Sequence, residues 1–317
     1  MRDRCTGGGG APALALMAAM ALAACAPPRP PETDPRPAPR AAAAAPAPAS
    51  ARSREVAAYF ARVEADLRAR GLLRTDGGGP DTPFGPRQLV ENFVRIALYD
   101  EYAQSGGTIV ARETPSPLRR WAAPVRIGLR FGASVPEGQR IRDTALVTAY
   151  AARLARVTRH PVRVTDIAPN FWVYVVSEDE RPALGPEWAG LFRGVAPADL
   201  AFATGMDLRT FCLVLAISEG DSAVYSGALA VIRSELPDLL RLSCFHEEIA
   251  QGLGLANDSP LARPSIFNDD EEFALLTRMD EALLRMLYDP RLRPGMREAE
   301  ARPIVEAIAA GLAPGGS

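Results

Sequence analysis

The amino-acid sequence predicts a mixed α/β (α+β) fold, and two patterns support this prediction. Apolar residues alternate with polar ones in short runs such as residues 124–131, which is typical of half-buried strands. Between these runs, apolar residues recur at helical spacing, as in residues 138–157. Hydrophobic residues make up 48% of the 317 residues, which is enough for a sizeable core.

Residues 51–110 are expected to form a helical cap, and residues 111–317 the main domain. Ser53 can cap a helix over residues 53–70, which Gly71 can end, and a second helix is expected at about residues 88–102. The later elements are expected, in chain order, as a strand at 124–131, a helix at 138–157, strands at 162–167 and 171–176, an irregular insertion at 182–207, strands at 211–217 and 224–233, a helix at 235–253 with Ser234 as its cap, and a helical C-terminal subdomain from residue 276.

The first residues have the features of an export signal. Arg2 and Arg4 precede an apolar run, residues 11–24, which is shorter than the roughly 20 residues that a membrane span needs. The run ends in Leu22-Ala23-Ala24-Cys25, which resembles the lipobox of bacterial lipoproteins. That resemblance implies a signal peptide over residues 1–24 and acylation (palmitate) of Cys25, and Ala26 favours the outer membrane, facing the periplasm. The alternative is an ordinary signal peptide with an incidental cysteine.

Residues 25–50 consist almost entirely of Pro, Ala and Arg and predict an extended tether. At roughly 3 Å per residue, such a tether reaches about 75 Å. Removal of residues 1–24 leaves 34 basic and 37 acidic residues, a net charge of −3. This near-neutral balance, without a basic stripe, argues against nucleic acid as a partner.

Two cysteines remain after Cys5 is removed with the signal and Cys25 is acylated. Because the periplasm is oxidising, a Cys212–Cys244 disulfide is predicted, and two buried free thiols are the alternative. His246 lies only two positions after Cys244, so the two side chains would point to different faces of a helix. We therefore do not expect a cysteine nucleophile.

The predicted helix at 235–253 has the spacing of a zincin site, in which two ligands stand at positions i and i+4 and a glutamate base at i+1. A start at His246 fails, because position i+4 is Ala250. A start at Glu247 makes Glu248 the base, Gln251 the second ligand and Asn257, at i+10 beyond a turn at Gly254, the third. The spacing fits, but none of the three ligand positions is a histidine.

These residues and others downstream together resemble the family called domain of unknown function 2927, which is described as proteobacterial lipoproteins of no assigned activity. The resemblance covers roughly residues 90–300 and implies a zincin-like or metzincin-like mixed sheet with an active-site-type helix. The residues that carry it are Glu247, Glu248, Gln251, Gly254, Leu255, Asn257, Asp258, Ser265 to Asp269 and Tyr288 to Met296; residues 264–268 stand where a metzincin has its methionine turn.

The ligand chemistry leaves two interpretations open. Amide oxygens at Gln251 and Asn257 are weak donors to zinc, so we expect no cofactor and a polar network in a degenerate, pseudoenzyme-like cleft. Alternatively, Asp258 replaces Asn257 and gives an oxygen-only set with Glu247 that suits a hard divalent cation better than zinc.

The expected function is that of an envelope lipoprotein that binds or scaffolds. Its expected partners are the membrane, through the lipid anchor, and an envelope protein, a peptide or peptidoglycan. The alternative is a peptidase-like hydrolase in which Glu248 is the general base, so enzyme activity is left open. His160, beside Pro161, is expected at the surface near a helix C-terminus.

Overall fold

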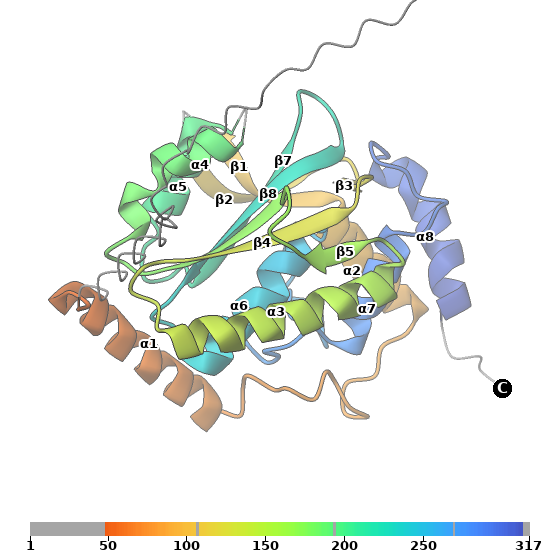
Figure 1. The fold of residues 1–317 in the computed structure, drawn as a ribbon. Coiled ribbons are helices and arrows are strands. Elements are labelled where there is room, and N and C mark those ends of the chain that lie inside the picture. Colours follow the sequence, from red (N-terminus) through yellow and green to blue (C-terminus); the bar gives the residue numbers. More distant parts are fainter. Residues whose placement is uncertain (1–47, 106–107, 193–194, 269, 313–317) are drawn as a thin grey trace, which may run out of the picture. The chain divides into compact units, whose positions relative to one another are not determined.

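A six-stranded, mostly parallel sheet forms the middle of the protein (Figure 1). Strand β7 runs antiparallel to β8, and every other neighbouring pair is parallel. The strand order is β3-β8-β6-β4-β5, with β7 paired to β8 off this path. The strands are β3 (Arg120–Trp121), β4 (Val125–Phe131), β5 (Val162–Val164), β6 (Phe171–Val176), β7 (Cys212–Ser218) and β8 (Val224–Arg233). This arrangement confirms the mixed α/β prediction.

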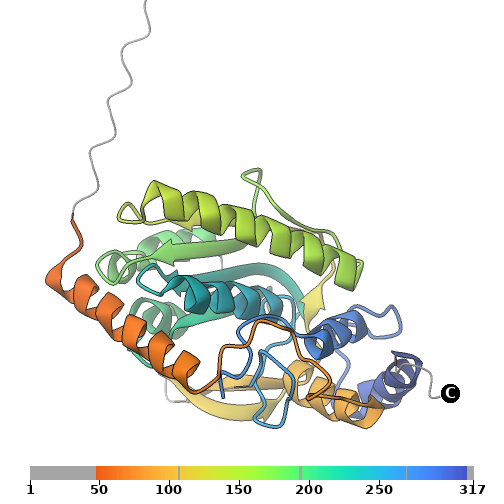
Figure 2. The same ribbon diagram turned by 90° about the horizontal axis from the view of Figure 1, so that it is seen from below.

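Helices cover both faces of the sheet. Successive side chains of a strand point to opposite faces, so apolar residues of one strand pack into two separate cores. Val173 of β6 packs into the larger core, and Tyr174 packs into a smaller one with Trp188 on the other face. The larger core includes residues of α1 (Ala51–Ala69), α2 (Pro86–Ala97), α3 (Glu137–Thr158), α6 (Asp238–Gln251), α7 (Arg278–Leu287) and α8 (Glu298–Leu312), seen from below in Figure 2. The smaller core includes residues of α4 (Gly185–Leu191) and α5 (Pro197–Thr204).

The computed structural model describes residues 48–105, 108–192, 195–268 and 270–312. These belong to one unit, which runs from Pro46 to Ser317. The predicted signal peptide, Cys25 and all but the last three residues of the predicted tether lie outside the described residues. Within the described ranges, no helix combines the length and the apolar character that a membrane crossing needs.

The second helix ends earlier than predicted. It stops at Ala97 rather than near residue 102, and the chain continues as β1 (Tyr99–Ser105), which pairs antiparallel with β2 (Thr108–Pro115). The backbone groups after Leu98 are satisfied by pairing between β1 and β2, a contact between two segments that helical spacing in the sequence does not reveal. The predicted helical cap therefore contains a hairpin.

Residues 182–207 were expected to be irregular, and this expectation was wrong. They contain most of a 3₁₀ turn, Arg181–Ala183, followed by α4 and α5. Each begins with a proline in its first turn, where the missing N–H costs nothing. Helices of seven and eight residues are too short to show a clear apolar period. The prolines therefore favoured the interpretation of this segment as irregular.

Two helix starts also differ from the prediction. Ser50 rather than Ser53 caps α1, and the Ser53 hydroxyl donates to Glu235 at 2.7 Å. Helix α6 begins at Asp238 after Pro237, not at Glu235 after Ser234. Because Glu235 also accepts from the Glu178 N–H at 2.7 Å, it ties the chain before α6 to two other segments instead of joining the helix.

The buried Arg233 fixes the segment after α5 to the end of β8. Its guanidinium donates to the carbonyl oxygens of Met206 at 2.8 Å and Asp207 at 2.7 Å and pairs with Glu178 at 2.5 Å. A fully buried guanidinium needs such partners, since an unpaired buried charge is costly. The insertion is therefore held firmly beside the sheet.

The end of α6 lies very close to the sheet. A Cβ at Gly252 would stand 2.5 Å from the Phe171 ring, so this position requires glycine. The Trp121 indole N–H donates to the Gly252 carbonyl at 2.8 Å. Two residues on, Gly254 has φ +126°, and a Cβ there would stand 2.3 Å from the Arg119 carbonyl oxygen. Only glycine allows this turn.

We expect Gly254→Ala to lower the free energy of unfolding by about 3 kcal/mol or more, because backbone strain and a backbone clash add together. Gly220→Ala is the matched control. Gly220 also has positive φ, but nothing lies within 4 Å of its Cβ position, so strain of about 1 kcal/mol is expected alone. Urea unfolding of both variants measures the difference. Equal losses would show that the Arg119 carbonyl does not restrict position 254.

Candidate functional site

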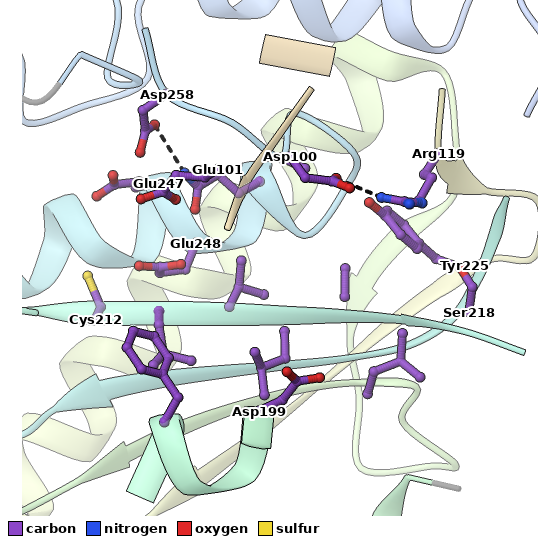
Figure 3. A pocket seen from close by; sticks show the side chains of 18 of the residues that line it. Asp100, Glu101, Arg119, Asp199, Cys212, Ser218, Tyr225, Glu247, Glu248 and Asp258 are labelled. Atoms are coloured by element: carbon purple, nitrogen blue, oxygen red, sulfur yellow. Dashed lines mark hydrogen bonds and ion pairs between the residues drawn. The ribbon is translucent and has the colours of Figure 1, made fainter. Parts of the chain in front are cut away.

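A cavity of about 910 Å³ lies along strand β7. All seven residues of β7 line it, together with Asp199 and Phe202 of α5 and residues of α6. Among the described residues, β7 pairs with β8 only. The cavity therefore follows an edge strand of the sheet, with α5 and α6 on the two sides of that strand (Figure 3).

The charges that line the cavity are mostly negative. Eight acidic residues and three arginines line it: Asp100, Glu101, Asp199, Asp221, Glu247, Glu248, Asp258 and Glu271, with Arg119, Arg209 and Arg297. Arg119 pairs with Asp100 at 2.7 Å, and Arg209 pairs with Asp207 at 2.7 Å. Figure 3 shows Glu101, Glu247, Glu248 and Asp258 gathered at one end of the cavity. This excess of carboxylates favours a positively charged occupant.

Glu248 is the most unusual of these side chains. It is 4% exposed, and its Oε2 atom has no hydrogen-bond partner in the structure. Burial raises the pKa of the Glu248 carboxyl well above its usual value, and the charges of Asp258 and Glu101 raise it further. The pKa of the neighbouring Glu247 is raised in the same way, first by burial and then by the charge of Glu248.

The predicted ligand positions do not converge. The Asn257 side chain donates to the Arg95 carbonyl at 2.9 Å, and its backbone N–H donates to the Ile96 carbonyl at 3.1 Å. Asn257 thus holds the end of α2 and does not line the cavity. Gln251 does line it and donates to Asp258 at 3.1 Å. The structure therefore brings Asp258, not Asn257, to Glu247, Glu248 and Gln251.

Cys212 of β7 and Cys244 of α6 form a disulfide, with Cα atoms 5.9 Å apart. The Cys212 sulfur lies within 4.8 Å of a carboxylate oxygen of Glu247 and of Glu248. A disulfide sulfur is not a thiolate, which is the form that binds zinc. With Asn257 turned away and this sulfur oxidised, the residues do not fit the zinc site that the metzincin-like spacing implies.

Neither histidine belongs to the cavity. His246 stacks on Tyr150 with ring centroids 4.0 Å apart, and its Nδ1 accepts from the Leu276 N–H at 3.1 Å. His160 lies half-buried just after the end of α3, where its Nε2 contacts the Ala123 carbonyl oxygen at 2.9 Å. Both rings therefore have structural partners.

Residues 264–268, predicted to floor the site, form a turn behind it. The Ser265 hydroxyl donates to Asp280 at 2.6 Å, and Asp280 also accepts from the Ile266 N–H at 3.1 Å. None of these five residues lines the cavity. They hold the start of α7 in place, with Thr277 as its capping residue.

Three further residues that line the cavity were not predicted from the sequence: Glu101, Asp199 and Phe202, which come from the unpredicted strand β1 and helix α5. No local spacing connects them to α6, since they reach the cavity only through the tertiary fold. The one available signal was the Asp100-Glu101 pair inside an otherwise apolar stretch.

The burial of His246 can be tested through the pH dependence of the free energy of unfolding. Burial lowers its pKa from 6.5 to about 3, so the unfolded chain binds more protons and the folded state loses stability as pH falls below 6.5. We expect a loss of about 2 kcal/mol between pH 7 and pH 5 from this group. In His246→Asn, the amide oxygen can accept from Leu276 but does not titrate.

The readout is the difference in pH slope between wild type and His246→Asn, measured by chemical unfolding at each pH. Other acidic groups titrate in both proteins and cancel in this difference. Identical slopes would mean that His246 is exposed or charged in the folded protein.

Comparison with known proteins gives one finding. A model of the family described as "Protein of unknown function (DUF2927)" matches residues 86–307, which is more than half of the chain. It confirms the family resemblance noted in the sequence. No curated protein and no solved structure gives a match.

Proposed function

Since the chain belongs to the DUF2927 family, whose description assigns no activity, we propose a function from its own cleft. The protein is a lipoprotein anchored through Cys25 in the outer membrane and facing the periplasm, and its cavity binds an extended peptide segment of an envelope protein or of peptidoglycan. This is a binding or scaffolding role.

The observation that carries the proposal is the position of β7. An edge strand offers unpaired N–H and C=O groups, and an extended peptide can add to it as a further strand. In β7 these groups border a cavity of about 910 Å³ instead of open solvent. Cavities of roughly 300–1,000 Å³ are typical of ligand sites.

The side chains of β7 favour a peptide with apolar side chains. Val214 and Ala216 pack toward the α6 side, and Leu213, Leu215 and Ile217 pack toward the α5 side. A bound peptide would therefore meet apolar walls on both faces, with carboxylates at one end. Such a site selects for alternating apolar side chains and for positive charge.

A hydrolase is the second candidate, and the raised pKa of Glu248 favours it. A general base works best when its pKa lies near the working pH, and a buried carboxyl beside other carboxylates moves in that direction. In this case Glu248 would accept a proton from water as the water attacks the peptide carbonyl carbon, and would pass that proton to the departing amine as the C–N bond breaks. Cleavage of the ligand separates the two candidates.

The anchor is tested with Cys25→Ser. We expect this variant to lose palmitate labelling and to leave the membrane fraction, because a single acylation site provides the hydrophobic anchor. Fractionation of cells with labelled palmitate measures both effects. A variant that stays fully in the membrane fraction would contradict lipid anchoring at this residue.

The cleft is tested with a displayed library of random peptides panned against the full-length protein in detergent. Selected peptides should protect the backbone amides of residues 213–217 from hydrogen exchange. Ala216→Arg places a long side chain in the cavity and should weaken binding by at least about tenfold, since it removes the space for the peptide. Ala152→Arg, at an exposed position of α3, is the matched control.

Peptides that bind equally well to both arginine variants would contradict binding along β7. Mass spectrometry of the bound peptides adds the second readout. Cleavage that disappears in Glu248→Gln would assign the hydrolase function instead of binding alone.

A further inference from the structure

Four carboxylates from three separate segments meet at one end of the cavity. Glu247 and Glu248 come from α6, Asp258 from the loop after it, and Glu101 from β1. Carboxylate oxygens of Glu247 and Glu248 lie within 4.8 Å of each other. Burial raises the pKa of both glutamates, and the neighbouring charges that raise it further are acidic.

A second observation indicates a ligand at this place. The Oε2 atom of Glu248 is buried and has no hydrogen-bond partner among the residues that the structure describes, and the side chain lines the cavity. Buried polar atoms in folded proteins nearly always have a partner, and those without one call for a ligand, an ion or a water. Because the neighbouring side chains of Glu247, Asp258 and Glu101 are also carboxylates, a positively charged partner is favoured at this atom.

We propose that Glu247 and Glu248, whose carboxylate oxygens lie within 4.8 Å of each other, bind one hard divalent cation, with calcium as the preferred ion, and that Asp258 and Glu101 add negative charge beside it. Calcium takes six to eight oxygen ligands, including carboxylates, amide oxygens and water, in flexible geometry. Gln251 uses its nitrogen to donate to Asp258, so its amide oxygen is available as a further ligand.

Zinc is disfavoured at this site by the same residues. Zinc sites in proteins are built mainly from thiolate and imidazole ligands. The sulfur grouped with these carboxylates among the described residues is that of Cys212, which is in the Cys212–Cys244 disulfide, and the His246 Nδ1 already accepts from the Leu276 N–H. An oxygen-only set remains, which suits calcium, magnesium or manganese.

The test is calorimetric titration of calcium chloride into full-length protein in detergent, after treatment with a chelator and its removal. We expect one calcium ion per chain with Kd of about 10⁻⁴ to 10⁻³ M, the range of extracellular calcium modules. The temperature of unfolding should rise with calcium concentration, because the ion binds only the folded state. No peptide is involved, so this result is independent of the proposed peptide binding.

The variants Glu248→Gln and Asp258→Asn should weaken calcium binding by at least about tenfold, since the first removes a ligand and the second removes a negative charge beside the ion. Without metal, Glu248→Gln should raise the temperature of unfolding, because a neutral amide replaces a buried carboxyl whose charged form is disfavoured by burial and by its acidic neighbours. These opposite effects separate loss of a ligand from loss of the fold. Glu306→Gln, at an exposed position of α8, is the control and should bind calcium normally.

Absence of calcium binding up to several millimolar would overturn the proposal. So would calcium binding of equal strength in Glu248→Gln and Glu306→Gln, or stoichiometric zinc that calcium cannot displace.

Discussion

The closeness of α6 to the sheet is the constraint from which the rest of the cleft follows. With no side chain at position 252, the last turn of the helix lies against the Phe171 ring. Three contacts fix this end: Trp121 donates to the Gly252 carbonyl at 2.8 Å, Tyr288 donates to the Leu253 carbonyl at 3.0 Å, and Gly254 passes beside Arg119. Once the helix is placed in this way, the direction of each α6 side chain is set.

This placement also explains why two adjacent glutamates can be buried. Neighbours on a helix point in directions about 100° apart, so adjacent side chains usually do not share one environment. Here the cavity is wide enough to receive both, and Asp258 and Glu101 close it from other segments. The same helix carries a buried ion pair, Arg241 with Asp143 at 3.0 Å, and the disulfide through Cys244. The elements that hold the fold together and the candidate site therefore share α6.

Long periodic segments could be predicted from the sequence, and contacts between distant segments could not. The helix predicted at 138–157 is observed at Glu137–Thr158, and the strand at 224–233 is observed with the same bounds. The zincin-type spacing pointed to α6, whose Glu247, Glu248 and Gln251 line the cavity. It failed at Asn257, because the choice between Asn257 and Asp258 depends on the carbonyls at the end of α2, which lie about 160 residues earlier in the chain.

The disulfide between Cys212 and Cys244 has a mechanical consequence for recognition. It joins the edge strand directly to the helix that carries the carboxylates, so the two walls of the cleft cannot separate without breaking a covalent bond. A ligand must therefore adapt to a gap of fixed width. The protein loses little conformational freedom on binding, and the entropy cost of complex formation falls mainly on the partner, which favours partners that are already extended.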